Sequence, residues 1–441
     1  MRRIGRDVFS QWSLIEIVAL LGLVFPTGLL FAQSPAYPFP QNRPQIAAPP
    51  KRMMTLAEIG GMATHNHPGV QQAKRQAEAL RGAWVQAGLR SNPSIGYSAE
   101  EMTNHNAGKQ GMTLSQPITP KYKLDARQST IEREYQAANQ TYFTQYQKAT
   151  NDAMLAAYRV AFASRKCLIL EELTRISQET QQAGNDLLKA GEIGRSAFLD
   201  IKIQSERTQI ALKDAQIAYL TACRELAILL SLPEKELIEI TDPVEILPPE
   251  LDEATLFAKI QATSPELRQA YAEVEAAKAR LRQQGTDAGI DYDANAKIAY
   301  NTDTKQSEFS LGVAVPVRLF DRNQGNIQRA RAELAASHRN VERLEWLIAQ
   351  RYAKQLGEYQ MTRNRVVAYK ERILSEARES LDLALDAYRR GECGSLELLD
   401  AQRTFSSVQI EYLDNLNALM ESQVLLQGAL LSGGLEKPGT E

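Results

Sequence analysis

The side chains able to do chemistry are few, and their spacing matches no catalytic or zinc-binding motif. The sequence contains four histidines, of which His65 and His67 form the one close pair. Two imidazoles at this spacing could bind a transition metal. Polar residues immediately before Pro68 are also typical of the start of a helix, and we favour that interpretation. We predict no metal site and no cofactor.

Glu397 and Asp400 are the most informative carboxylates. They stand three residues apart, which places them on one face of a helix. Such a pair is either an ordinary solvated surface or, if it faces an enclosed path, a site that attracts cations. No nucleophile elbow, phosphate-binding loop or histidine-centred constellation accompanies it. We therefore do not predict an enzyme, and the surrounding segment becomes the better guide.

The segment around this pair occurs twice in the chain. Residues 391–400 read GECGSLELLD, and residues 191–200 read GEIGRSAFLD. Other segments match at nearly the same offset: 63–79 with 262–276, and 114–118 with 313–317. The chain is therefore a tandem duplication. Two equivalent halves favour a pseudo-symmetric assembly over an asymmetric catalytic pocket.

The N-terminus has the pattern of a secretory signal peptide, because Arg2, Arg3 and Arg6 precede an apolar run from Leu14 to Phe31. An uncleaved membrane anchor is the alternative. A proline-rich stretch follows, which is typical of an extended tether. The predicted organisation is a signal peptide at 1–33, a linker at 34–54, a first repeat at 55–250, a second repeat at 251–434 and a C-terminal tail at 435–441.

The overall charge excludes one class of partner. Lys plus Arg number 51 and Asp plus Glu number 53, so the chain lacks the basic field that nucleic acid requires. The three cysteines, Cys167, Cys223 and Cys393, are scattered without CxxC spacing. They predict packing residues rather than a disulfide framework or a zinc site. Nucleic acid is therefore not expected as a partner.

Each half contains a segment that alternates between apolar and polar residues. In the second half, residues 292–300 and 309–315 place apolar side chains on one face and polar side chains on the other. We predict one β-hairpin at about 94–118 and another at about 290–317. Strands of this length suit a membrane barrel with a wet lumen. A soluble antiparallel sheet over a core has the same alternation, so the strands alone leave both open.

The segments after the hairpins separate these alternatives. Neither 121–189 nor 326–390 contains a proline, and at about 1.5 Å per residue each could form a helix about 100 Å long. Each reaches a glycine pair and returns as a second long periodic segment. Glycine supplies the positive φ that a tight helical turn needs. A membrane β-segment continued by long helical hairpins predicts a conduit that crosses a neighbouring compartment.

These features resemble the outer-membrane efflux protein family, of which TolC is the type member. The resemblance rests on the duplicated order, on Asn92-Pro93 before the first strands, on the two Gly-x-x-Gly turns and on the Leu-Asp endings at residues 199–200 and 399–400. Residues 315–327, VPVRLFDRNQGNI, look most like the CzcC-like heavy-metal efflux branch. The resemblance covers nearly all of the chain after the signal peptide.

The resemblance implies an assembly and its partners. We expect a homotrimer in the cell outer membrane, with four strands per protomer closing a 12-stranded β-barrel that continues as a periplasmic α-barrel. It implies contact with outer-membrane lipid, a periplasmic adaptor of the membrane fusion protein class and an inner-membrane pump of the RND type. The function would be a passive conduit in a tripartite efflux system, with metal cations as one candidate cargo. The alternative is a periplasmic coiled-coil scaffold or adaptor without a pore.

The resemblance also assigns roles to residues. The adaptor would dock at the two turns, which comprise Gly191, Glu192, Ile193 and Gly194 in the first half and Gly391, Glu392, Cys393 and Gly394 in the second. The periplasmic constriction would contain Glu397, Asp400 and Asp200. The first half has Ala197 at the position of Glu397, so we do not expect an acidic ring built equally from both halves. The alternative for the carboxylates is a solvated helix face, and neither the cargo nor the state of the gate follows from the sequence.

Overall fold

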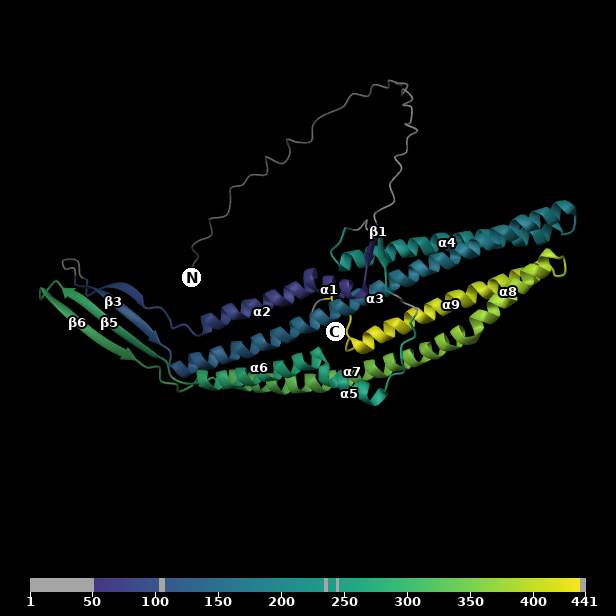
Figure 1. The fold of residues 1–441 in the computed structure, drawn as a ribbon. Helices are drawn as coiled ribbons and strands as arrows, with labels where there is room; N and C mark the ends of the chain where they lie inside the picture. Colours follow the sequence, from purple (N-terminus) through teal and green to yellow (C-terminus); the bar gives the residue numbers. More distant parts are fainter. Residues whose placement is uncertain (1–50, 103–107, 234–236, 243–245, 437–441) are drawn as a thin grey trace, which may run out of the picture. The chain divides into compact units, whose positions relative to one another are not determined.

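Two long helical hairpins and a four-stranded sheet form most of the described chain (Figure 1). The computed structural model describes residues 51–102, 108–233, 237–242 and 246–436. The chain divides into two units, Met1–Ala48 and Pro49–Glu441, and the described residues belong to the second. The predicted signal peptide at 1–33 lies outside the described residues, as does the predicted linker up to residue 50.

The same order of elements occurs twice. The first half contains β1 (Lys51–Met54), α1 (Leu56–Asn66), α2 (Pro68–Ala87), β2 (Ser94–Glu100), β3 (Lys109–Ile118), α3 (Lys121–Ala190) and α4 (Arg195–Leu229). The second contains β4 (Leu237–Ile240), α5 (Glu253–Thr263), α6 (Pro265–Asp287), β5 (Tyr292–Asn301), β6 (Gln306–Ala314), α7 (Gln324–Ala368), η1 (Tyr369–Ile373), α8 (Leu374–Arg389) and α9 (Ser395–Gln427). The predicted duplication is confirmed.

Local signals explain where the shorter helices begin. Thr55 forms a capping box at the start of α1: the Glu58 amide donates to Thr55 Oγ1 at 3.2 Å, and the Thr55 amide donates to Glu58 Oε2 at 2.8 Å. Pro68 and Pro265 occupy the first turns of α2 and α6, where a missing N–H is tolerated. These are the helix starts that the sequence pattern indicates.

The first glycine of each turn ends its helix in the left-handed conformation. Gly191 has φ 79° and Gly391 has φ 71°. The amide of Glu192 donates to Leu187 O at 2.9 Å, and that of Glu392 donates to Ala387 O at 2.8 Å, so both turns satisfy helix carbonyls in the Schellman pattern. The second glycines, Gly194 and Gly394, have extended backbone instead. Only one glycine of each pair therefore supplies the positive φ.

The long helices differ in continuity. α3 runs 70 residues without interruption, which corresponds to about 105 Å. Its counterpart in the second half is interrupted by the π-helical turn η1, which separates α7 from α8. The sequence predicted one continuous helix here. The phenol of Tyr369, the first residue of η1, hydrogen-bonds Glu411 of α9.

The hydrophobic core is distributed along the helices rather than gathered in one place. One cluster joins the middle of α3 to α7 and α9 and includes Tyr359 and Leu416. A second lies under the parallel pair β1–β4 and includes Leu226 and Ile238. A third lies between the two hairpins near their turns and includes Leu381. Sequence analysis did not predict β1, which occupies the last residues of the proposed linker.

Within this unit, the four-stranded sheet lies at one end and the α3–α4 and α8–α9 turns lie at the other (Figure 1). The order in the sheet is β2-β3-β5-β6, with every pair antiparallel. The strand pairs of the two halves therefore combine into one sheet. In the part of the chain that the structure describes, no helix is both long and apolar enough to cross a bilayer.

The chain after α9 is fastened to the middle of α3. Asn151 is 3% exposed, and its Nδ2 donates to Gly428 O at 2.8 Å and to Leu431 O at 2.7 Å. Asp152 accepts from the amides of Gly433 at 3.0 Å and Gly434 at 2.6 Å. Two adjacent side chains of α3 therefore supply hydrogen-bond partners to backbone carbonyls and amides of the segment that follows α9.

We predict that Asn151→Ala lowers the free energy of unfolding by about 1 to 3 kcal/mol, because the buried Leu431 carbonyl loses its donor and Gly428 O keeps only the longer bond from the Leu431 amide at 3.4 Å. The midpoint of thermal unfolding, followed by circular dichroism in detergent, measures this. Gln147→Ala is the matched control, because Gln147 donates to Asn151 Oδ1 at 2.9 Å and does not contact either carbonyl. Equal midpoints for the two variants would contradict the anchoring role.

A pH effect is predicted at the junction of α1 and α2. His67 is 1% exposed, and neither ring nitrogen has a hydrogen-bond partner among the residues that the structure describes. Burial lowers the pKa of His67, and Asp152 opposes part of that shift. Below about pH 6.5 the unfolded chain binds a proton that the folded chain resists, so stability falls as the pH falls. His67→Ser, which copies the buried Ser264 of the second half, should reduce the drop in melting temperature between about pH 7.5 and 5.5.

Candidate functional site

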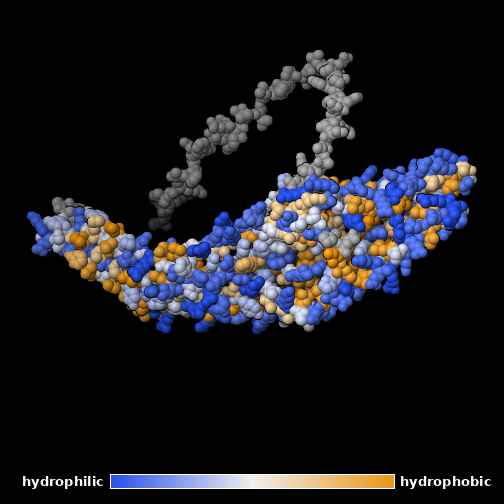
Figure 2. Space-filling model, viewed as in Figure 1, coloured by the Kyte–Doolittle hydropathy of each residue, from blue (hydrophilic) through white to orange (hydrophobic). Residues whose placement is uncertain are grey.

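The register of the sheet gathers apolar side chains into continuous rows. One row contains Ile95, Leu114, Ala296 and Leu311, and the next contains Tyr97, Met112, Ile298 and Phe309. These residues lie on one face because directly paired residues share a face of an antiparallel sheet. Ile95 is 72% exposed and Leu311 is 74% exposed. Apolar residues gather over this end of the unit in Figure 2.

The opposite face of the sheet is polar and charged. The row between the two apolar rows contains Gly96, Thr113, Lys297 and Ser310. Lys297 pairs with Glu100, and Lys109 Nζ lies 3.5 Å from Glu308 and 3.7 Å from Glu101. The alternation predicted from the sequence is confirmed. One face of the sheet is suited to hydrocarbon and the other to water.

The outer edges of this sheet are open. Among the described strands, β2 has β3 as its one neighbour and β6 has β5. Each edge leaves backbone N–H and C=O groups without a partner in the sheet, and such groups are costly in an apolar surrounding. The described protomer therefore has both an exposed apolar face and two open sheet edges.

A charged junction holds the sheet against the helices. Lys123, in the first turn of α3, is 1% exposed, and its Nζ lies 2.7 Å from Gly289 O and 2.9 Å from Asp291 Oδ1. Arg318 donates to Asp287 O at 2.9 Å. Asn323, with φ 64°, donates to Gln284 O at 2.8 Å. The sequence analysis singled out the segment containing Arg318 and Asn323, but it gave no signal for Lys123.

The two turns at the other end are exposed at their glycines and acidic residues. Ile193 and Cys393 occupy the same position in the two turns, and both are half-buried and pack against the core between the hairpins. Burial raises the pKa of the Cys393 thiol, and Glu397 and Glu392 raise it further, so the thiol stays protonated. Glu392 pairs with Arg390 at 2.9 Å. The turns therefore present charged rims around an apolar centre.

The three carboxylates predicted for a constriction are all exposed. Glu397 and Asp400 lie in the first two turns of α9, and Asp200 lies in the second turn of α4. Arg403 Nε donates to Gln204 Oε1 at 3.2 Å, which joins α9 to α4 one turn beyond Asp400 and Asp200. Among the described residues, none of the three carboxylates forms an ion pair. Arg403 is a nearby cation that the sequence analysis did not single out.

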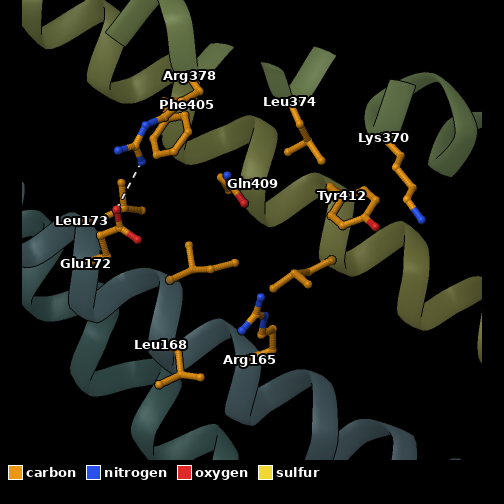
Figure 3. A pocket seen from close by; sticks show the side chains of 12 residues that line it. Arg165, Leu168, Glu172, Leu173, Lys370, Leu374, Arg378, Phe405, Gln409 and Tyr412 are labelled. Atoms are coloured by element: carbon orange, nitrogen blue, oxygen red, sulfur yellow. Dashed lines mark hydrogen bonds and ion pairs between the residues drawn. The ribbon is translucent and has the colours of Figure 1, made fainter. Parts of the chain in front are cut away.

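A groove of ≈410 Å³ separates the two hairpins where α8 meets η1 (Figure 3). Arg378 dominates one side: it lies 3.2 Å from Glu172 and 3.3 Å from Asp382, and its guanidinium lies 5.4 Å from the centre of the Phe405 ring. The hydrogen bond that Arg378 donates to Glu172 raises the pKa of Arg378. This contact between α3, α8 and α9 joins the first half to the second. Sequence spacing did not reveal it, because Glu172 and Arg378 are distant along the chain.

Comparison with known proteins was made against families, curated proteins and solved structures. The model of the family described as "Outer membrane efflux protein" matches residues 60–231 and 256–430. The cobalt-zinc-cadmium resistance protein CzcC of Cupriavidus metallidurans is 22% identical over 372 residues, which cover 84% of this chain and 87% of that protein.

Solved structures share the fold at low sequence identity. A structure of CusC superposes with a TM-score of 0.70 and 18% identity, covering 91% of this chain and 99% of that chain. The CmeC outer membrane channel of Campylobacter jejuni superposes with a TM-score of 0.71 and 13% identity, covering 88% of this chain and 87% of that chain. The arrangement of sheet and hairpins is therefore a known one.

The two faces of the sheet predict opposite responses to the same substitution. Ile298→Lys places a charge on the apolar face and should destabilise the protein in phospholipid vesicles by about 2 to 4 kcal/mol. Ser115→Lys places it on the polar face and should leave stability close to that of the wild type. Urea unfolding in vesicles, followed by tryptophan fluorescence, measures both. A larger cost for Ser115→Lys would reverse the assignment of the faces.

Proposed function

The chain belongs to the outer membrane efflux protein family, and we propose that three copies form one continuous channel. The family's function is efflux through a channel in the outer membrane that extends into the periplasm and works within a tripartite system. The observation that supports a pore most directly is the two-faced sheet with two open edges. Three such sheets would supply 12 strands and leave no edge unpaired in lipid.

The helices support the same proposal. Four helices pack side by side in the order α2, α3, α6 and α7. α2 and α7 are therefore the two ends of this row, just as β2 and β6 are the two edges of the sheet. A closed ring of three copies would pair α7 of one copy with α2 of the next. The polar composition of the long helices suits walls that contact water on both sides. A soluble scaffold would not require the exposed apolar rows.

We propose that the two turns dock a periplasmic adaptor, which connects the channel to an inner-membrane pump of the RND type. The support is their position at the end opposite the sheet and their exposure: Gly191 and Glu192 in the first turn, Gly391 and Glu392 in the second. The apolar centres at Ile193 and Cys393 are matched in place but differ in chemistry. An adaptor would therefore meet two related but unequal sites in each protomer.

The cargo proposed for this channel is a metal cation. The resistance protein CzcC, a relative over most of both chains, is named for cobalt, zinc and cadmium. Among the described residues, no group of His, Cys, Asp or Glu could hold a metal ion, so cations would pass without a resident site. The proposed filter is the constriction formed by Glu397, Asp400 and Asp200, where carboxylates would favour cations and repel anions.

Conductance in planar lipid bilayers tests the channel and its filter. We expect stepwise, cation-selective openings from the wild type, and a cation-to-anion permeability ratio closer to one after Glu397→Gln with Asp400→Gln, because the proposed ring loses its charge. Glu376→Gln with Glu379→Gln is the matched control, since these exposed carboxylates on α8 have the same spacing. If the Glu397→Gln, Asp400→Gln variant opens with unchanged selectivity, the channel proposal stands and the proposed filter is wrong. A protein that never conducts would remove both.

A further inference from the structure

The apolar alternation of β6 continues past the end of the strand. Phe309, Leu311 and Val313 lie on the apolar face, and Val315 follows at the next position of that face. β6 pairs with β5 only through Ala314. Val315 is 45% exposed and Val317 is 78% exposed. The segment after β6 therefore has the pattern of a strand without a strand beside it.

The matching segment of the first half does have a partner. β3 continues through Pro117 and Ile118, which pair with Asp293 and Tyr292 of β5. Pro117 corresponds to Pro316 in the duplication, because residues 114–118 match 313–317. The proline alone therefore does not end pairing in this fold. What β6 lacks is a neighbour that corresponds to β5.

The duplication identifies that neighbour. β3 of the first half pairs with β5 of the second. At the open side of β6, the equivalent pair is β6 of one copy and β2 of the next. β2 is the counterpart of β5, since each is the first strand of its hairpin and pairs with the second in an equivalent register: Ser94 with Ser115, and Asp293 with Ala314.

The register of the new pair follows from the register of the known one. β3 pairs with β5 as Gln116 with Ala294 and Leu114 with Ala296. Moving each residue to its counterpart in the other half places Val315 opposite Ile95 and Val313 opposite Tyr97 of the next copy. All four are apolar-face residues, as antiparallel pairing requires. A row of directly paired residues that begins at Ile95 ends at Leu311. In the proposed register, Leu311 does not pair with Ile95 of the next copy. It meets β2 of that copy further along the strand.

Barrel geometry requires a step of this size. Following directly paired residues from Ser94 through Ser115 and Asn295 leads to Gly312. In the proposed pair, Gly312 lies opposite Ser98 of the next copy, four residues further along β2 than Ser94. Closing 12 strands at a tilt of about 35 to 45° needs a stagger of about four to six residues per protomer. The opposite step would place Tyr97–Glu100 of β2 beyond the start of β6 at Gln306, so more than half of β2 would have nothing to pair with.

We infer that β6 is extended through Val315 and Pro316 by pairing with β2 of a second copy of this chain, with Val315 opposite Ile95 and Pro316 opposite Ser94. This inference rests on the proposed homotrimer and specifies its strand-to-strand boundary. The extension provides partners for both open edges and covers Val315 with an apolar neighbour. A direct closure without the step would instead put Leu311 opposite Ile95.

Cysteine crosslinking in native membranes distinguishes the two registers. Ile95→Cys combined with Val315→Cys should form covalent trimers on mild oxidation, because directly paired strand residues lie within disulfide reach. Ile95→Cys combined with Leu311→Cys should not. Each single substitution is a control for the native cysteines, of which Cys167 and Cys223 are buried. A second stepped pair, Tyr97→Cys with Val313→Cys, guards against a variant that fails to assemble.

Failure of this inference is separable from failure of the proposed function. The mass of the uncrosslinked protein in detergent, measured by light scattering, reports the oligomeric state independently. Trimers that crosslink through Leu311, or equally through both sites, would overturn the stepped register and leave the channel intact. A monomeric protein that crosslinks through neither site would overturn the homotrimer itself.

Discussion

A strand in hydrocarbon must pair every backbone N–H and C=O, because lipid offers no replacement partner. This requirement shapes the protein. A sheet of four strands cannot meet it alone, since β2 and β6 each present an open edge. Within the described protomer nothing covers the apolar rows, since Ile95 is 72% exposed and Leu311 is 74% exposed. The proposed assembly would supply both the edge partners and the apolar surroundings that this end of the chain needs.

The long helices have a different requirement. They are largely polar, and they must still pack against one another in one defined alignment. Propensity and i,i+4 pairs contribute little to stability in water. The fold instead uses separate core clusters at intervals along the helices and a few buried polar contacts between halves. Lys123 fixes the start of α3 to the end of α6, and Asn151 fixes the end of the second half to the middle of the first. Contacts between distant segments therefore fix how the helices are aligned along their axes. The periodicity of apolar residues does not determine that alignment.

Much of this arrangement was predictable from the sequence. Proline-free runs predicted the long helices, Gly191 and Gly391 predicted the turns, and period-two alternation predicted the strands. The parts that were not predicted depend on tertiary contacts. β1 forms by pairing with β4, and η1 replaces α-helix within a run that contains no proline. Lys123 has the sequence context of an ordinary surface lysine. The roles proposed for Glu397, Asp400 and Asp200 would depend on neighbouring copies, and in the single chain the three are exposed carboxylates.

The π-helical turn has a mechanical consequence. α3 is one continuous α-helix, whereas its counterpart consists of α7 and α8 with the π-helical segment η1 between them. Departures from the α-helical ladder are where helices bend. A sideways load applied at the turns would be carried stiffly by the first hairpin, and bending of the second would concentrate at Tyr369–Ile373. The duplication placed two helical arms of similar length in one chain, and a π-helical segment interrupts the second.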